Sequence, residues 1–315
     1  MKAAIINQFG EAQELQITEV NKPIISDGQV LIKVMAASIN PVDTKVRAGI
    51  SGMSKQIKLP AILGWDVSGI VETTGKNVSG FRPGDAVFGC IGFPGLGKTY
   101  AEFTVANPKL LAKKPNNISF EESAAVPLAG LTAYQAINEH LKVIPGQKIL
   151  IQAAAGGVGH LAVQFAKLNG AYVSGTASDK NAKFLKTLGV DQIIDYKKEK
   201  FENLVSNLDG VIDAMGGKIL YRSIPCVKPG GTVVCLPSSS KDDTRAIELA
   251  QKHGVKLIWP MMRTDGQQMQ IIAGLLEQKK LKVHIDKIFT LDQIVWAHKA
   301  VETHGSKGKV VVRIN

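Results

Sequence analysis

The feature that most limits how this chain can fold is residues 152–167, QAAAGGVGHLAVQFAK. An apolar run, KILIQA, leads into three glycines in four positions, and an amphipathic run follows them. A strand, a glycine turn and a helix in this order open a βαβ unit, in which the amides at the helix start can bind a phosphate. We therefore expect a dinucleotide on this turn; the alternative is a turn that only joins a strand to a helix.

The spacing of the glycines gives them different roles. Gly156 would let the backbone approach a pyrophosphate, and Gly159 would let the helix pack closely on the strand. Ala154 stands where the usual fingerprint has its first glycine, so the pattern is A-x-G-x-x-G. The residues of the turn expected to bind the dinucleotide are Ala155, Gly156, Gly157, Val158 and Gly159.

Strands and helices alternate around this turn. The strands KILIQA, AYVSGT, QIIDY, GVIDAMG and GGTVVCLP are mostly separated by helical stretches, and this alternation calls for parallel βαβ units. Residues 1–120 read instead as irregular antiparallel strands and turns, to which the last strand, GKVVVRI, is expected to return. The fold class is therefore α/β, with a doubly wound nucleotide-binding domain over 121–261 and a β-rich domain over 1–120, completed by about 262–315.

The end of the second strand indicates which dinucleotide fits. NAD sites usually have Asp or Glu there, but this strand ends SGTAS. Ser178, Lys180 and Asn181 instead suit a 2′-phosphate, and Tyr196 would cover the adenine or reach that phosphate. Asp179 lies near the spacing of an NAD acid, although a carboxylate at a helix start explains its position equally well. We therefore favour NADPH over NADH.

The net charge of +11 is compatible with nucleic acid, an anionic membrane or an acidic small ligand. The lysines are scattered, however, and aromatic residues are only 6%, whereas single-stranded nucleic acids need basic stripes with aromatics. No apolar run approaches the length of a membrane span, and Cys90, Cys226 and Cys235 lie far apart among apolar residues. We expect a soluble, cytoplasmic protein with buried thiols and no membrane partner, and we disfavour nucleic acid as a partner.

Several motifs together resemble the medium-chain dehydrogenase/reductase superfamily over nearly the whole chain. MKAAIINQFG, VLIKVMAASINPVDTKVRAG, LGWDVSGIVETTGKNVSGFRPGDAVFG, PLAGLTAY, AAAGGVGHLAVQFAK and PGGTVV occur in the order of that family. The resemblance implies a GroES-like catalytic domain, a Rossmann domain that binds NADP, and an active site between the two.

The zinc ligands of that family are missing from these motifs. Zinc-dependent members have a Cys where this chain has Asn40, and a His-Glu pair where it has Trp65-Asp66. Their structural lobe has four cysteines, and the corresponding stretch here has one. We therefore expect no metal. The resemblance narrows to the zinc-free quinone oxidoreductases, zeta-crystallins and alkenal/enone reductases.

This branch implies hydride transfer from NADPH to a quinone or an α,β-unsaturated carbonyl. Asn40 and Asp43 match the family's polar pair beside the nicotinamide, and Thr132 matches a hydroxyl there. These three are the candidate catalytic residues, and Asn40 and Thr132 are also candidates for cofactor binding; the alternative is that they only hold turns or caps. Lys45 and Trp65 are expected at the substrate pocket, with exposed surface and the core as their respective alternatives.

Two other functions stay open at this point. One is a non-catalytic NADPH-binding protein with a role in RNA binding, and the other is an enoyl-thioester reductase. Because relatives are often dimers, a homodimer is expected.

Overall fold

The computed structural model describes residues 1–303 and 305–315, and the chain divides into two compact units. One unit consists of Met1–Leu131 and Arg263–Asn315, and the other of Thr132–Met262. The sequence placed the corresponding boundaries after residues 120 and 261. Helix α3 (Pro127–Gln135) carries the chain from the first unit into the second.

The second unit is built on a parallel sheet, which confirms the predicted class. Its strand order is β11-β10-β9-β12-β13-β14, and each neighbouring pair is parallel. The strands are β9 (Lys148–Ile151), β10 (Tyr172–Ala177), β11 (Gln192–Asp195), β12 (Leu208–Asp213), β13 (Val227–Cys235) and β14 (Lys256–Ile258).

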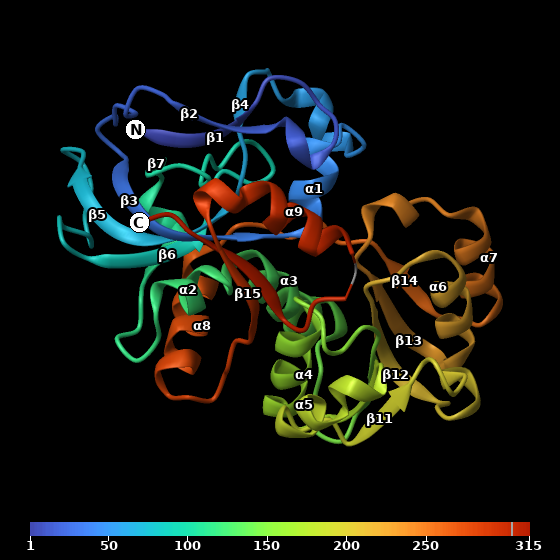
Figure 1. Ribbon diagram of the computed structural model, residues 1–315. Coiled ribbons are helices and arrows are strands. Elements are labelled where there is room, and N and C mark those ends of the chain that lie inside the picture. Colours follow the sequence, from blue (N-terminus) through green and yellow to red (C-terminus); the bar gives the residue numbers. More distant parts are fainter. Residues whose placement is uncertain (304) are drawn as a thin grey trace. The chain divides into compact units, whose positions relative to one another are not determined.

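The crossover helices of this unit are α4 (Gly159–Leu168), α5 (Ala182–Thr187), α6 (Gly217–Ser223) and α7 (Thr244–Lys252). From β9 the chain moves outward through β10 to β11, and then returns to the other side of β9 with β12. Right-handed crossovers place the helices of these two halves on opposite faces of the sheet. Figure 1 shows this arrangement, with α4 and α5 on one face and α6 and α7 on the other.

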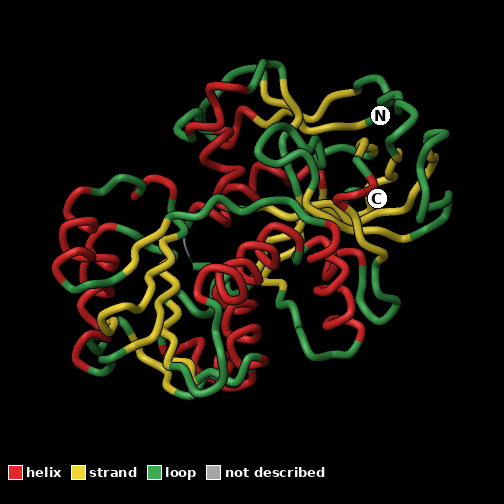
Figure 2. Tube along the Cα trace, turned by 180° about the vertical axis from the view of Figure 1, so that it is seen from behind, coloured by secondary structure: helices red, strands yellow, loops and turns green. Residues whose placement is uncertain are grey.

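The first unit contains two sheets, whose strands are yellow in Figure 2. Its larger sheet has the order β15-β16-β3-β5-β6-β8, with β7 also paired to β3, and a smaller sheet has the order β2-β1-β4. The strands are β1 (Lys2–Ile6), β2 (Leu15–Glu19), β3 (Val30–Ile39), β4 (Ala61–Ile62), β5 (Asp66–Thr74), β6 (Ala86–Cys90), β7 (Phe103–Ala106), β8 (Leu111–Lys113), β15 (Ile285–Thr290) and β16 (Lys309–Arg313). The helices are α1 (Pro41–Arg47), α2 (Phe120–Ala124), α8 (Gly266–Glu277) and α9 (Ile294–Glu302).

Two local features of this unit concern its last strand and the start of α2. The last strand returns to it, because β16 pairs antiparallel with β3 from Val310 opposite Ile39 to Arg313 opposite Ala36. A capping box starts α2, in which the Ser119 amide donates to Glu122 Oε2 at 2.8 Å and the Glu122 amide donates to Ser119 Oγ at 3.0 Å.

Two further observations concern the burial of the cysteines and the length of the helices. In the described structure Cys90, Cys226 and Cys235 are all buried and form no disulfide. No helix within residues 1–303 and 305–315 is long and apolar enough to cross a bilayer.

Candidate functional site

The glycine turn joins β9 to α4 and presents unpaired amides at the helix start. Ala153 adopts a left-handed conformation with φ of 52°, and its carbonyl accepts the Gly156 amide at 2.9 Å. The amides of Gly157, Val158 and Gly159 donate to no backbone carbonyl among the described residues. These donors and the positive end of the helix dipole make the turn suited to an anion.

Gly159 has the packing role that the fingerprint predicts. A Cβ on this residue would lie 2.2 Å from the Ala153 carbonyl oxygen and 2.8 Å from Ala154 Cα. Both are backbone atoms that cannot move aside. Gly156 is less constrained, since its nearest neighbour would lie 3.2 Å away.

Strand β10 accommodates the alanine that replaces the first glycine of the fingerprint. A Cβ on Gly175 would lie 2.9 Å from Ala154 Cβ, so a glycine on the neighbouring strand makes room for Ala154. Thr176 fixes the same turn, because its Oγ1 accepts the Ala153 amide at 3.1 Å and donates to Gln152 Oε1 at 2.7 Å. Its carbonyl also accepts the Ala154 amide at 2.9 Å.

The turn follows β9, the strand at which the strand order reverses: β10 and β11 lie on one side of β9, and β12, β13 and β14 lie on the other. Strands β10 and β12 flank β9, and ligands of such sheets bind outside the carboxyl ends of the strands at this point. The loop after β12 is held by Asp213, which accepts the amides of Met215 and Gly216 at 2.8 and 2.7 Å. Burial raises the pKa of Asp213.

The residues predicted to bind a 2′-phosphate follow the adjacent ends of β10 and β11. Ala177 pairs with Asp195, so Ser178 and Tyr196 each begin the loop after a paired residue. Tyr196 is 59% exposed, while Ser178 is buried. Lys180 is exposed and Asn181 half-buried in the turn Asp179–Asn181.

The competing acid, Asp179, lies close to Lys198, a residue that was not predicted from the sequence. Lys198 Nζ lies 3.5 Å from Asp179 Oδ2 and 3.6 Å from Asp195 Oδ2. The lysine therefore faces two carboxylates, those of Asp179 and Asp195, and offsets part of the negative charge at this corner.

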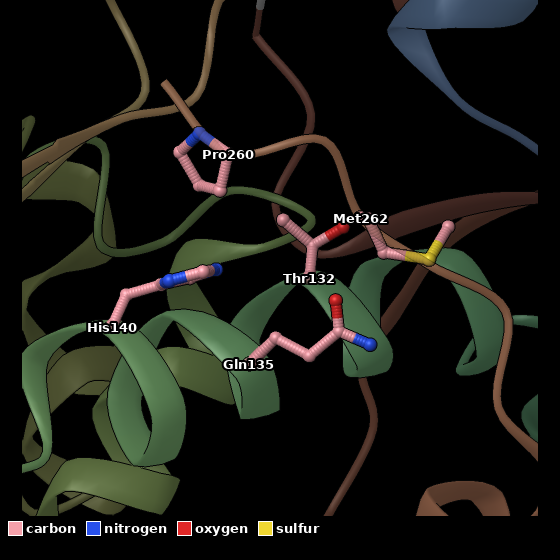
Figure 3. Close-up of a pocket in the computed structure, with 5 residues that line it drawn as sticks. All are labelled: Thr132, Gln135, His140, Pro260 and Met262. Atoms are coloured by element: carbon pink, nitrogen blue, oxygen red, sulfur yellow. The ribbon is translucent and has the colours of Figure 1, made fainter. Parts of the chain in front are cut away.

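Thr132 lies at a small cavity within the second unit. The cavity measures about 10 Å³ and is lined by Thr132, Gln135, His140, Pro260 and Met262. Figure 3 shows the first three projecting from α3 and the helical turn after it (Ala136–Leu141) toward the loop with Pro260 and Met262. Pro260, Met262, Gln135 and His140 were not predicted from the sequence.

Asn40 and Asp43 belong to a buried polar group in the first unit, which we call the Asp66 cluster: Asn40, Asp43, Asp66, Tyr100 and Lys309. The Asn40 amide nitrogen donates to Asp66 Oδ2 at 2.8 Å, and Asn40 Oδ1 accepts a short hydrogen bond from Lys309 Nζ. Asp43 accepts the Asn40 backbone amide at 2.7 Å and the Tyr100 hydroxyl at 2.7 Å. Lys309 Nζ lies 3.7 Å from Asp66 Oδ2.

Burial sets the electrostatics of this cluster. It raises the pKa of Asp43 to about 7, although the hydrogen bond from Tyr100 acts in the opposite direction. Burial also raises the pKa of Tyr100 well above its ordinary value. It lowers the pKa of Lys309, while the charge of Asp66 opposes this shift. The cluster contains two carboxyl groups, those of Asp43 and Asp66, and one ammonium group, that of Lys309.

The two residues predicted at the substrate pocket are placed differently. Lys45 lies half-buried on α1. Trp65 is fully buried, its indole N–H donates to the Gly95 carbonyl at 2.6 Å, and its ring meets Phe93 edge to face at 5.7 Å. The structure thus gives Trp65 the surroundings of a core aromatic, the alternative that the sequence left open.

Comparisons with known proteins agree with this architecture. Residues 26–116 match the family described as alcohol dehydrogenase GroES-like domain, and residues 188–312 match the family described as zinc-binding dehydrogenase. The chain is 36% identical to the 2-methylene-furan-3-one reductase of Solanum lycopersicum, over 99% of this chain and 79% of the relative.

Solved structures extend the likeness to the whole fold. The quinone oxidoreductase from Coxiella burnetii superimposes with a TM-score of 0.95 at 38% identity, over 100% of this chain and 99% of the other. The Escherichia coli quinone oxidoreductase complexed with NADPH superimposes with a TM-score of 0.89 at 26% identity, over 100% of both chains.

The zinc in one of these descriptions can be tested against the side chains present. At the three positions of the family's ligands stand Asn40, the buried Trp65, and Asp66, and the Lys309 ammonium contacts both Asn40 and Asp66. Zinc binds thiolates, imidazoles and carboxylates, and a neighbouring ammonium repels it. The described residues contain no group of three or more His, Cys, Asp or Glu side chains that could hold a metal. This donor set therefore does not fit zinc.

Proposed function

Because the chain belongs to the medium-chain dehydrogenase/reductase superfamily, in its quinone oxidoreductase and alkenal/one reductase branch, we propose that it is a zinc-independent enzyme that uses NADPH to reduce a quinone or an α,β-unsaturated carbonyl. The observation that carries this proposal is the β9–α4 turn, where the amides of Gly157, Val158 and Gly159 have no backbone acceptor among the described residues. Such a turn at the switch point of a doubly wound sheet is built to hold a diphosphate.

The residues of the second unit would hold the cofactor. The backbone from Ala155 to Gly159 would bind the diphosphate, and Thr132 would contact the nicotinamide end. Ser178, Lys180, Asn181 and Tyr196 would bind the adenosine end. When bound, the reduced nicotinamide supplies a hydride to the acceptor.

The preference for NADPH over NADH rests on the charge at the ends of β10 and β11. Lys180 is exposed there, and Lys198 lies against Asp179. A lysine beside a phosphate contributes a charge-assisted hydrogen bond, which is stronger than a neutral one. Lys180→Met should therefore weaken NADPH binding by about tenfold and leave NADH binding nearly unchanged. Lys186→Met, at an exposed lysine of α5, is the matched control.

Reduction of a quinone or an enone requires hydrogen-bond donors at the acceptor oxygen more than it requires a strong general acid. Conjugation spreads the negative charge that arrives on a quinone or an enone, so hydrogen-bond donors aimed at its oxygen suffice. We assign this donation to the Asn40 amide, with Asp43 holding the start of α1 through the Asn40 backbone. Lys45 or solvent would supply the proton. The homodimer and the cytoplasmic location stay predictions.

A spectrophotometric assay tests the function. We expect NADPH oxidation with at least one member of a panel of quinones and enones, a slower reaction with NADH, and no effect of zinc chelators. Loss of activity after chelation, or the absence of turnover with every acceptor, would contradict the proposal.

A further inference from the structure

Lys309 is a lysine whose ammonium group the fold buries completely. The residue is 3% exposed and starts β16, whose next three residues, Val310 to Val312, are core side chains. Its Nζ donates to the Ile39 carbonyl at 3.3 Å and to Asn40 Oδ1. A buried charge is costly unless it is paired, so an ammonium kept at this position calls for an explanation.

The contacts of Lys309 and Asp66 leave the Asn40 amide one orientation. An ammonium can only donate hydrogen bonds, and a carboxylate can only accept them. The Asn40 oxygen therefore faces Lys309, and its nitrogen faces Asp66 at 2.8 Å. Turning the amide over would set its NH₂ group against the ammonium and its oxygen against the carboxylate.

Asp66 is itself held from two other sides. Its Oδ2 accepts the Ser38 hydroxyl at 2.6 Å, and its Oδ1 accepts the Leu128 amide at 2.7 Å. The carboxylate cannot follow a moving Asn40 without breaking these bonds. Both partners of the amide are therefore held in place, Lys309 by its position on β16 and Asp66 by its bonds to β3 and α3.

The same contacts change the strength of Asn40 as a donor. A cation on the carbonyl oxygen draws electrons from the amide and makes its N–H groups stronger donors. An asparagine amide has two N–H bonds, and Asp66 uses one of them. The second has no hydrogen-bond partner among the described residues, and the Asn40 residue is 1% exposed.

We propose that Lys309 is a positioning residue that orients and polarises the Asn40 amide, so that its second N–H stabilises the negative charge that develops on the oxygen of a quinone or enone. This inference rests on the proposed function, because it assigns Asn40 the role of oxyanion donor. In this role Lys309 is a buried cation that influences the acceptor oxygen through the side-chain amide of Asn40.

Variants of two residues separate positioning from folding. Lys309→Met keeps the length of the side chain and removes the charge. It leaves buried carboxyl groups without their cation, so the double variant Lys309→Met/Asp66→Asn, which removes both charges, is compared with it. In the double variant the Asn40 amide is free to turn over. Arg313→Met is the matched control, because Arg313 lies on the same strand and pairs with Glu121 at the surface.

Three quantities are measured for each folded variant: kcat with one quinone and one enone, the dissociation constant of NADPH, and the pKa of p-nitrophenol bound to the NADP⁺ complex, read from its absorbance. p-Nitrophenol serves as the probe because its oxyanion mimics the charged product. Only a change in the field around the acceptor oxygen moves this last value.

We expect Lys309→Met and the double variant to lower kcat by about 10- to 100-fold, with NADPH binding changed by less than about threefold. The pKa of bound p-nitrophenol should rise toward its value in water, and Arg313→Met should behave as the wild type. A double variant with the kcat and bound p-nitrophenol pKa of the wild type would overturn the inference. If Asn40→Ala slows the wild-type reaction while both Lys309 variants do not, this inference alone fails. If the wild type itself oxidises no NADPH, the proposed function fails and the inference fails with it.

Discussion

Among single residues, Gly159 allows α4 to approach β9 closely because it has no Cβ atom. The Ala153 carbonyl would lie 2.2 Å from a Cβ there, which is far inside contact distance. With a Cβ at this position, the start of α4 would have to move away from the Ala153 carbonyl, and the amides at the helix start would move with it. The local requirement is thus for glycine itself, and not for a small side chain in general.

Gly159→Ala should therefore displace the start of α4. We expect it to lower the free energy of unfolding by about 1–3 kcal/mol and to weaken NADPH binding by at least about tenfold. Thermal unfolding and a fluorescence titration measure the two effects.

Gly274→Ala is the control for this substitution. Gly274 lies within α8, and a Cβ there would meet nothing within 4 Å. Alanine should stabilise this helix by about 0.5–1 kcal/mol. Equal effects of the two substitutions would show that the close approach at Gly159 has no energetic consequence.

Among the elements, β10 and the glycine turn are matched to each other. Ala154 of the turn and Gly175 of β10 share a space that holds one methyl group and not two, because the second Cβ would lie 2.9 Å from the first. The departure from the usual fingerprint at Ala154 is therefore compensated on the neighbouring strand.

This matching predicts a rescue. Gly175→Ala alone should lower the free energy of unfolding and the affinity for NADPH, and adding Ala154→Gly should restore much of both. The coupling in the double-mutant cycle should be at least about 0.5 kcal/mol. Additive effects of the two substitutions would mean that the turn and β10 are not coupled through this contact.

The elements of the second unit were predictable because their signals are local. The strand, glycine turn and helix of residues 148–168 lie next to one another in the sequence. The Asp66 cluster gave no such signal, since its partners Asn40, Asp66 and Lys309 are far apart in the chain and meet only where β16 pairs with β3. The one available hint was a lysine at the start of an otherwise apolar strand, GKVVVRI.

For the molecule as a whole, the free energy of unfolding depends on pH through two buried groups, His298 and Asp43, whose effects have opposite signs. His298 is fully buried, and neither ring nitrogen has a hydrogen-bond partner among the described residues. Burial lowers its pKa from 6.5 to about 3, so stability falls as the pH drops through this range. Burial raises the pKa of Asp43 from 3.8 to about 7, so stability falls as the pH rises through that range. Between about pH 4 and 6.5 the two effects cancel.

Single substitutions should expose each effect. In Asp43→Asn, the free energy of unfolding should rise with pH more steeply than in the wild type, by about 1.4 kcal/mol per pH unit between about pH 4 and 6.5. In His298→Leu it should rise less steeply by the same amount. Urea unfolding at a series of pH values measures both slopes. Parallel curves for the wild type and either variant would contradict the assignment for that residue.

In the proposed function, the amides at the start of α4 hold the diphosphate of NADPH. Calorimetric titration of the wild-type protein with NADPH, repeated with NADH, tests this most directly. We expect saturable binding of one NADPH per chain and weaker binding of NADH. The absence of any detectable binding of either nucleotide at millimolar concentration would contradict it.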